Sequence, residues 1–330
     1  VRRITAYREY ITFSYSERTC SATRCRNINM KTLGNLIRRD LRLFFKDKGL
    51  FFSSMLTPLI LLVLYATFLA RVYRDSFLSA LPAGLNVSDA LIDGTVAAQL
   101  ASSLLAVSCV TVAFCSNLLM IQDKASGAIR DLTVSPVRRS SISAAYYAAS
   151  ALSTLAVTFT ALAACLIYMR VVGWYMSATD VVSVILDTLL LTLFGTALSS
   201  CINFFLSTSA QASAVGTIVS AGYGFLCGAY MPISSFGTGL QHFLSFMPGT
   251  YGTSLLRNHM LAGIFREMSS IGFPDVVVSG IGASIDCSPQ LFDRVVSVGG
   301  MYAILGGAII LFTALYILFG VLAGRHASAK

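Results

Sequence analysis

Charged residues are scarce in this chain. They make up 12% of its 330 residues, whereas 55% are hydrophobic. A soluble domain carries about 25% charged residues, so the composition argues against a soluble globular protein. Several apolar runs exceed the ~18 to 20 residues that cross the hydrocarbon core of a bilayer. Because these runs are continuous rather than alternating, they favour helices over a β-barrel. We therefore expect an all-α polytopic membrane protein.

The sequence also lacks the common motifs of catalysis. It contains no Gly-x-x-x-x-Gly-Lys-Ser/Thr loop for nucleotide phosphates, no His-Glu-x-x-His zinc pair and no Gly-x-Ser-x-Gly elbow. Its three histidines, His242, His259 and His326, are scattered along the chain. We expect no catalytic residue, no metal site and no cofactor held by this chain, and therefore a protein that is not an enzyme.

The basic residues follow the positive-inside pattern rather than that of a nucleic-acid surface. The net charge is +9. From Met30 onward, twelve Lys and Arg residues lie in segments that we expect on the cytoplasmic side, and six lie in segments expected outside. This asymmetry predicts a multi-pass protein of the plasma membrane, expected to be bacterial, with both termini in the cytoplasm. No nucleic-acid partner is expected.

Residues 1–29 differ from the rest of the sequence. They are polar and rich in Arg, and they show no helical periodicity of apolar residues. They are either a disordered, non-native extension upstream of a natural start at Met30 or a presequence, since Arg-rich, acid-poor tails can be transit peptides. Neither interpretation gives this tail a fold. The membrane domain is therefore expected to cover residues 30–330.

Hydrophobic periodicity predicts an interfacial helix followed by six membrane spans. Residues 30–48 place Leu33, Ile37 and Leu41 on one face among basic side chains, which is typical of an amphipathic helix at the cytoplasmic interface. The expected spans cover about 51–72, 97–121, 143–169, 180–206, 212–231 and 302–323. A polar loop at 122–141 separates the second span from the third, and an external segment at 232–300 precedes the sixth.

The loop at 122–141 is long for a connection between two spans. Its charged residues are mostly basic: Lys124, Arg130, Arg138 and Arg139, against Asp123 and Asp131. It has room for a helix of two or three turns that stops ahead of Pro136, since a proline disfavours helix at the residue before it. A stiff cytoplasmic protrusion indicates a soluble partner that docks there. The alternative is a simple solvated loop.

Two prolines, Pro232 and Pro248, flank a short apolar segment in the external part of the chain. With about 15 residues, this segment is too short to span the membrane. It suits a re-entrant or interfacial helical hairpin, which a membrane tolerates only where protein covers the broken backbone. Pro232 is expected to end the fifth span.

The fifth span carries small residues at four-residue spacing: Gly216, Ser220, Gly224 and Gly228. On a helix this spacing produces one face with almost no side chain, where another backbone can approach closely. The face is either a packing contact within one subunit, or a subunit interface or moving contact.

Asp187 is the one acid clearly inside an apolar run. Carboxylates within the membrane are default candidates for a transport function. Because Asp187 lies near the expected external end of the fourth span, where it can reach water or headgroups, a structural role and a functional role remain equally open.

Two motifs, on opposite sides of the expected membrane, can be compared with a known family. In the external segment, Pro248-x-Thr250-Tyr251 is followed by Leu256-Arg257; in the loop, Gly127 and Leu132 precede Ser135-Pro136-Val137. With the amphipathic helix and the spans around these motifs, the chain from Met30 onward resembles a type-2 ABC export permease, which is the membrane subunit of an ATP-driven exporter.

The resemblance implies roles for individual residues. The loop at 122–141 would be the coupling element on which an ATPase acts, through Asp123, Gly127, Arg130, Leu132 and Pro136. The external hairpin would form a gate, with Pro232, Pro248, Tyr251 and Arg257. One departure concerns the loop. Relatives often carry a Glu-rich approach to the glycine and an acid after it, whereas here Asp123 is the only acid before Gly127, and Arg130 stands near the expected second acid.

The resemblance also implies partners and a substrate class. A second permease subunit would complete a homo- or heterodimer, separate ABC ATPase subunits would carry ATP and Mg, and membrane lipid would surround the spans. The exported substrate would be a lipophilic drug, as in multidrug transport, an antibiotic, a lipid or a glycan. The alternative is a secondary transporter or channel with no ATPase partner. It would need several buried charged residues as ion relays, and only Asp187 qualifies.

Overall fold

The computed structural model describes residues 30–71, 73–75, 88–134, 137, 139–291 and 294–328. The predicted extension at 1–29 and Pro136 lie outside the described residues. Nearly all the secondary structure is helical, which confirms an all-α polytopic membrane fold. The helix Met30–Lys46, called here the N-terminal helix, opens the described part of the chain.

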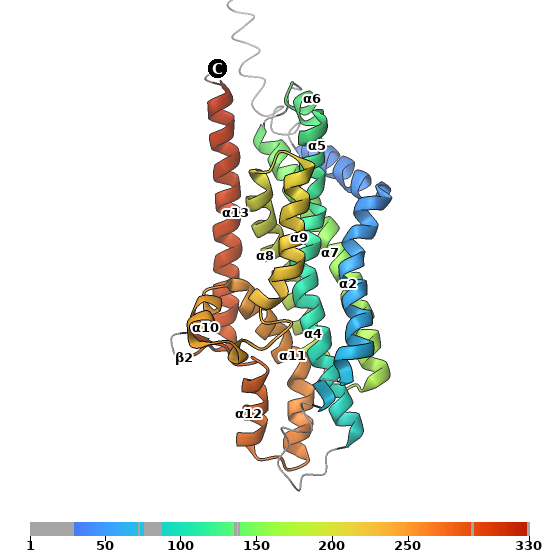
Figure 1. The fold of residues 1–330 in the computed structure, drawn as a ribbon. Helices are drawn as coiled ribbons and strands as arrows, with labels where there is room; N and C mark the ends of the chain where they lie inside the picture. The colour runs from blue at the N-terminus through green and yellow to red at the C-terminus, as the bar shows by residue number, and fades with distance from the viewer. Residues whose placement is uncertain are drawn as a thin grey trace, which may run out of the picture.

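The remaining elements follow in chain order (Figure 1). They are α2 Lys48–Leu64, the π-helix η1 Tyr65–Leu69, α4 Asp89–Ser116, α5 Leu118–Ser126, α6 Ala128–Val134, α7 Arg139–Val172, α8 Ala178–Phe204, α9 Ser209–Leu226, the 3-10 turn η2 Ile233–Ser235, α10 Thr238–Ser245, α11 Pro248–Ser270, α12 Asp275–Ser284, β1 Gln290–Leu291, β2 Arg294–Val295 and α13 Val298–Ser328. The two short strands pair antiparallel.

Within the described residues, four helices are long and apolar enough to cross a membrane. They are Asp89–Ser126, which joins α4 and α5, then Ser140–Val172, Ala178–Phe204 and Val298–Leu322. A fifth is added if the N-terminal helix and α2, which are bent by 72° relative to each other, count as one span. The expected fifth span corresponds to α9, whose 18 residues are not among these helices.

The bend before α2 is set by Asp47. Its carboxylate accepts hydrogen bonds from the backbone N–H groups of Gly49, at 2.9 Å, and Leu50, at 3.2 Å. This cap satisfies two of the donors that a new helix leaves open, so α2 starts in a new direction directly after the N-terminal helix ends.

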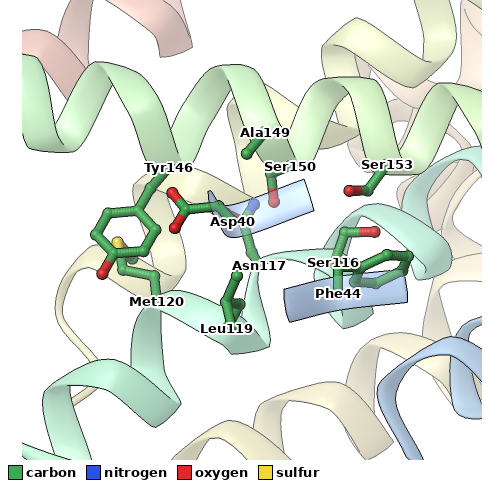
Figure 2. A pocket seen from close by; sticks show the side chains of 10 residues that line it. All are labelled: Asp40, Phe44, Ser116, Asn117, Leu119, Met120, Tyr146, Ala149, Ser150 and Ser153. Carbon is green, nitrogen blue, oxygen red and sulfur yellow. The ribbon is translucent and has the colours of Figure 1, made fainter. Parts of the chain in front are cut away.

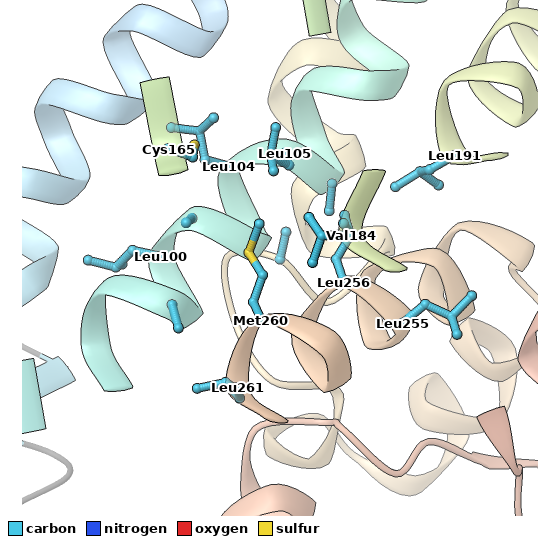
Figure 3. Close-up of a cluster of buried hydrophobic side chains, with 14 of the residues drawn as sticks. Leu100, Leu104, Leu105, Cys165, Val184, Leu191, Leu255, Leu256, Met260 and Leu261 are labelled. Atoms are coloured by element: carbon cyan, nitrogen blue, oxygen red, sulfur yellow. The ribbon is translucent and has the colours of Figure 1, made fainter. Parts of the chain in front are cut away.

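Helix α4 lies at the centre of the bundle, with α2, α7, α8, α9 and α11 packed around it. In the continuous helix Asp89–Ser126, 89% of the most apolar stretch is buried within the protein, against 17% for α13. Figure 3 shows Leu100, Leu104 and Leu105 of α4 in one apolar cluster with side chains from α8 and α11, such as Val184 and Leu256. This cluster is the main core of the protein.

Several hydroxyl groups of α4 bond to the backbone of the helix itself. Thr95 donates to the carbonyl oxygen of Leu91 at 2.7 Å, and Thr111 donates to that of Val107 at 3.0 Å. Such bonds allow Ser and Thr to be buried without partners on other helices. Their small size also lets neighbouring helices approach closely.

Gly195 of α8 lies directly against the backbone of α4. A Cβ atom at this position would lie 2.7 Å from the carbonyl oxygen of Cys109 and 3.0 Å from the Cα atom of Val110. Both atoms belong to the backbone of α4, so they cannot move aside as a flexible side chain can. The crossing of α4 and α8 therefore depends on glycine at position 195.

Replacing Gly195 tests this crossing. Gly195→Ala is expected to destabilise the protein by about 1–3 kcal/mol, because the two helices must separate. Gly307→Ala in α13 is the matched control, since nothing lies within 4 Å of the added methyl group. Thermal unfolding in detergent should show a lower midpoint for the first variant alone. An unchanged midpoint for Gly195→Ala would contradict the close crossing.

Candidate functional site

The helix that continues α4 turns sharply at Gly127. This residue has φ +84° and ends α5 in the left-handed region, which favours glycine. The N–H of Arg130 then bonds to the carbonyl oxygen of Gly127 at 2.8 Å and starts α6. We call the unit α5–Gly127–α6 the elbow; it projects at one end of the bundle (Figure 1). The expected helix in the loop at 122–141 is thus divided in two by Gly127.

The inner side of the elbow is tied to two other helices through Asp123. This carboxylate is buried. Its Oδ2 atom accepts a hydrogen bond from Arg39 of the N-terminal helix at 2.9 Å and from the Tyr146 hydroxyl of α7 at 2.6 Å. Hydrogen bonds between charged groups are the stronger ones in proteins, so Asp123 acts as a junction of three helices.

Arg39 also pairs with a second buried carboxylate. Its Nη1 atom lies 2.8 Å from Asp40 Oδ1, and only 2% of Asp40 is exposed. Figure 2 shows Asp40 between Tyr146 and Ser150 of α7 and Asn117 at the α4–α5 junction. One guanidinium group therefore serves two acids, and this arrangement seats the N-terminal helix against the base of the elbow.

Lys124 connects the elbow to α8. Its ammonium group donates to the carbonyl oxygens of Phe204 at 2.7 Å, Leu206 at 3.1 Å and Asn203 at 3.4 Å. Carbonyl groups at a helix C-terminus have no partner within the helix and carry partial negative charge, so a lysine there is favourable. The same ammonium lies 5.4 Å from the centre of the Phe204 ring.

Asn117 fixes the point where α4 passes into α5. It is buried, and its side-chain amide donates to the hydroxyl groups of Ser199 and Ser200 on α8, the latter at 3.1 Å. Nothing in the sequence pattern marks Lys124, Asn117 and Arg39 as a connected set. Their contacts bridge segments about 80 residues apart, and a single sequence carries no local signal of such pairs.

Of the proposed coupling set, only Arg130 among the described residues lies on the outer side of the elbow. Arg130 and Asp131 are exposed, whereas Leu132 is half-buried and packs on the cluster of Met120, Ile142 and Tyr146. Thus Gly127 shapes the turn, Asp123 and Leu132 face the bundle, and Arg130 lies on the surface of the elbow.

The hairpin that the sequence predicts on the external side, called the external hairpin for this expected position, has unequal arms. Helix α9 ends at Leu226, and Pro232 instead precedes the short turn η2, so the expectation that Pro232 ends the fifth span is wrong. The chain leaves α9 through Gly228, with φ +71°. Helix α10 has only 8 residues, while Pro248 occupies the first turn of the 23-residue α11. Proline suits that position because its missing N–H is not needed there.

Tyr251 and Thr250 hold the two arms of the hairpin together. The Tyr251 hydroxyl donates to the carbonyl oxygen of Ser245 at 2.6 Å, and the Thr250 hydroxyl donates to that of Leu244 at 3.1 Å. Both acceptors lie at the C-terminal end of α10, where carbonyl groups lack helical partners. The two residues therefore dock α10 on the start of α11.

Arg257 of α11 is almost completely buried, with 1% exposed. Its guanidinium group donates to the carbonyl oxygens of Gly228 at 2.6 Å and Ile285 at 3.0 Å, and to the Ser103 hydroxyl of α4 at 3.3 Å. It also lies 3.4 Å from the Asp286 carboxylate. The turn after α9, the segment after α12 and the central helix α4 thus meet at one side chain.

Asp286 completes this cluster from the segment between α12 and β1. Its Oδ2 atom also accepts a hydrogen bond from the backbone N–H of Ile233, the first residue of η2. Burial raises the pKa of Asp286, while Arg257 acts in the opposite direction. Its φ of +57° is unusual for a residue other than glycine, so this backbone conformation is maintained by the surrounding contacts.

Asp187 forms a separate polar cluster within the bundle. It is 1% exposed, and its Oδ2 atom lies 2.6 Å from His259 Nδ1 of α11. The Tyr302 hydroxyl of α13 donates to the other carboxylate oxygen at 2.6 Å. The carboxylate therefore joins three helices and does not project toward lipid.

The small residues of α9 do not share one packing role. Nothing lies within 4 Å of a Cβ atom placed at Gly216, and Ser220 is half-buried. Gly224 instead contacts the Tyr230 ring of the following turn, and Gly228 lies beyond the end of the helix. The four-residue spacing therefore does not define one helical face, because α9 ends at Leu226, before the last residue of the series.

Comparison with known families identifies the chain. The family model of the ABC-2 type transporter matches residues 32–261, more than two thirds of the sequence. The chain belongs to the ABC-2 type transporter family. No match is found among curated proteins. This ABC-2 protein is a multi-pass membrane component of an ABC transporter. The matched residues include the N-terminal helix, the elbow and the first part of α11 with Arg257.

Substitution of Arg257 should strongly disturb the region of this ABC-2 protein where α4, α11 and the turn after α9 meet. Arg257→Met is expected to cost about 3–5 kcal/mol, because Asp286 is left as a buried charge without its partner. Arg266→Met on the same helix is the control. Arg266 pairs with Asp180 but its side chain is 55% exposed, so the loss should stay below about 1 kcal/mol. Thermal unfolding in detergent measures both; equal losses would contradict the role of Arg257.

The Arg39 junction predicts how firmly the N-terminal helix is held. Arg39→Ala should lower the free energy of local opening of residues 31–46 by about 1–3 kcal/mol, because Asp40 and Asp123 lose a charged partner. Hydrogen exchange of this segment is the measurement. Arg38→Ala removes an exposed neighbouring charge and should leave the exchange unchanged. If both variants exchange alike, the junction does not hold the helix.

Proposed function

We propose that this ABC-2 protein is the permease subunit of an ATP-driven exporter and that the elbow is where a separate ABC ATPase subunit docks. The observation that carries the proposal is the elbow itself. A short, surface-exposed helix, α6, is held at a fixed angle to a helix that continues directly into the buried centre of the bundle.

The absence of a phosphate-binding loop from the sequence supports a separate ATPase as the source of energy for export. The sequence contains no phosphate-binding loop of the Gly-x-x-x-x-Gly-Lys-Ser/Thr type, so ATP and Mg would be held by the partner. The basic residues of the N-terminal helix and the loop at 122–141 favour a cytoplasmic position for the elbow, with both termini on the same side.

The contacts of the elbow support transmission of force. Asp123 and Lys124 are adjacent, yet they connect to different helices: Asp123 to the N-terminal helix and α7, and Lys124 to the end of α8. A push on α6 would therefore move four helices together. Near the middle of α4, Arg257 connects this helix with the turn after α9 that leads into the hairpin, so motion of α4 would reach the proposed gate.

The exposed side of α9 supports a second permease subunit. Ile218 is 70% exposed and Phe225 is 50% exposed, and Gly216 has open space above it. Small residues beside exposed apolar ones are typical of contacts between membrane helices. Either a second copy of this chain or a related permease would satisfy this face.

The substrate proposed for the exporter is a lipophilic drug, an antibiotic, a lipid or a glycan. The external hairpin encloses a cavity of about 480 Å³, lined by both apolar and polar side chains that include Tyr251 and Asp286. Mixed walls of this kind suit a ligand with both characters. This cavity is on the proposed exit side, next to the Arg257 cluster.

A secondary transporter is the second candidate, and one observation favours it. The buried Asp187 and the half-buried His259 and Tyr302 form a chain of hydrogen-bonding groups, of the type that proton-coupled transporters use. Such a protein would transport without ATP. Substrate uptake into inverted vesicles that depends on added ATP and persists after collapse of the proton gradient would exclude this alternative.

The docking proposal is tested by two glycine substitutions with equal backbone strain. Gly127 and Gly272 both have positive φ, +84° and +97°, and neither has an atom within 4 Å of an added Cβ. Valine costs about 1–3 kcal/mol in this conformation at either site. Gly127→Val should abolish association with the ATPase, because it alters the angle of α6, whereas Gly272→Val should not.

The measurement is Mg-ATP hydrolysis by tagged protein purified from its own membranes in mild detergent, with the attached ATPase identified by mass spectrometry of its phosphate-binding loop. We expect at least a tenfold loss of hydrolysis for Gly127→Val, corresponding to about 1.4 kcal/mol or more of binding free energy. Retained hydrolysis in a folded Gly127→Val protein, or equal losses in both variants, would contradict docking at the elbow.

A further inference from the structure

A groove runs along the outside of the bundle between α2 and α7. It encloses about 380 Å³, and its floor is formed by Leu104 of α4. Its walls are almost entirely apolar, from Phe52 to Leu62 on α2 and from Val157 to Cys165 on α7. The Thr160 hydroxyl on this wall donates to the carbonyl oxygen of Ala156 at 2.6 Å, within its own helix. The groove therefore offers shape and apolar contact.

The length and depth of the groove match one leaflet of a bilayer. From Phe52 to Leu62, α2 rises by roughly 15 Å. This is about half of the ~30 Å thickness of the hydrocarbon core. Phe52 lies one helical turn beyond Lys48, where α2 begins next to the interfacial N-terminal helix. The groove thus starts at the level of the headgroups and ends near the middle of the membrane.

Basic residues stand at the shallow end of the groove. Lys46 and Lys48 are both exposed, and they flank the bend between the N-terminal helix and α2. Asp47 between them is the helix cap and bonds to backbone N–H groups, so its charge is directed into the bend. Two lysines at headgroup level attract an anionic headgroup by about 1 kcal/mol each.

We propose that this groove is a binding site for an anionic phospholipid, with one acyl chain between α2 and α7 and the phosphate near Lys46 and Lys48. The ligand class follows from the three observations together: an apolar slot, the depth of one leaflet, and positive charge at its interfacial end. The site is separate from the elbow, and it does not depend on docking of an ATPase.

Two neighbouring alanines of α7 provide a matched test. Ala164 and Ala163 are both exposed, but only Ala164 lines the groove. Ala164→Trp fills the slot, whereas Ala163→Trp adds the same ring beside it. The probe is phosphatidylglycerol with a photo-reactive diazirine in one acyl chain, reconstituted with the full-length protein in phosphatidylcholine vesicles. Cross-linked peptides are located by mass spectrometry.

We expect cross-links to concentrate in the α2 and α7 peptides. Ala164→Trp should reduce them by roughly fourfold for each methylene displaced, while Ala163→Trp leaves them unchanged. Replacing both lysines, Lys46→Gln with Lys48→Gln, should lower the preference for phosphatidylglycerol over phosphatidylcholine by roughly fivefold per lysine. The same measurement is repeated with phosphatidylcholine that carries the same diazirine acyl chain. The loss of cross-links caused by Ala164→Trp with this uncharged probe shows the contribution of the slot alone.

Two results would overturn the proposal. The first result has two parts: the cross-link yield in α2 and α7 is no higher than on the exposed face of α13 around Ile310, and Ala164→Trp does not change it. This result would indicate ordinary boundary lipid. The second is an efficient cross-link between two copies of the chain through Leu59→Cys, which would show that a second subunit covers the groove. Loss of ATPase association affects neither measurement, so the two proposals fail independently.

Discussion

A helix that runs from Asp89 to Ser126 and is covered by protein along most of its length can satisfy its polar groups only from within the bundle. This constraint explains the composition of α4, in which small residues are common and Thr95 and Thr111 bond to the backbone of their own helix. It explains the requirement for glycine at position 195, where α8 crosses. Helix α4 also contacts both functional regions, because α5 continues it at one end and Arg257 bonds to its Ser103 near the middle.

The two regions use similar chemistry. At the elbow, Arg39 serves two buried carboxylates, and near the external hairpin Arg257 serves Asp286 and three neutral oxygen atoms. A buried charge with several partners adds less to stability than to specificity of arrangement, since any misplaced helix leaves that charge unsatisfied. We infer that these junctions fix the angle of the elbow and the position of the hairpin, so that a force applied at one is delivered at the other.

The sequence predicted the fold class, a helix over about 30–48 and the position of the elbow, because long apolar runs, hydrophobic periodicity and a glycine near a proline are local signals. It failed where the outcome depended on contacts between distant segments. The periodic series Gly216 to Gly228 suggested one helical face, yet the turn at Gly228 ends it, because Arg257 binds the Gly228 carbonyl group from another helix. The sequence predicted Asp123 as a docking residue on the surface, but its carboxylate is buried and accepts hydrogen bonds from Arg39 and Tyr146. The partners of Asp187 could not be predicted from the sequence either, because His259 and Tyr302 lie on α11 and α13, far from Asp187 along the chain.

The central claim is that α4 and α5 act as one rigid lever between elbow and hairpin. The distance between spin labels at Ala90→Cys and Gln122→Cys, exposed positions near its two ends, tests this claim most directly. In a helix without a hinge it should be roughly 48 Å. In the complex with the ATPase, we predict that a non-hydrolysable ATP analogue leaves this distance unchanged, while the distance between the Gln122 labels of the two subunits shortens. A shorter or broadened Ala90–Gln122 distance would place a hinge at Asn117 and contradict the account.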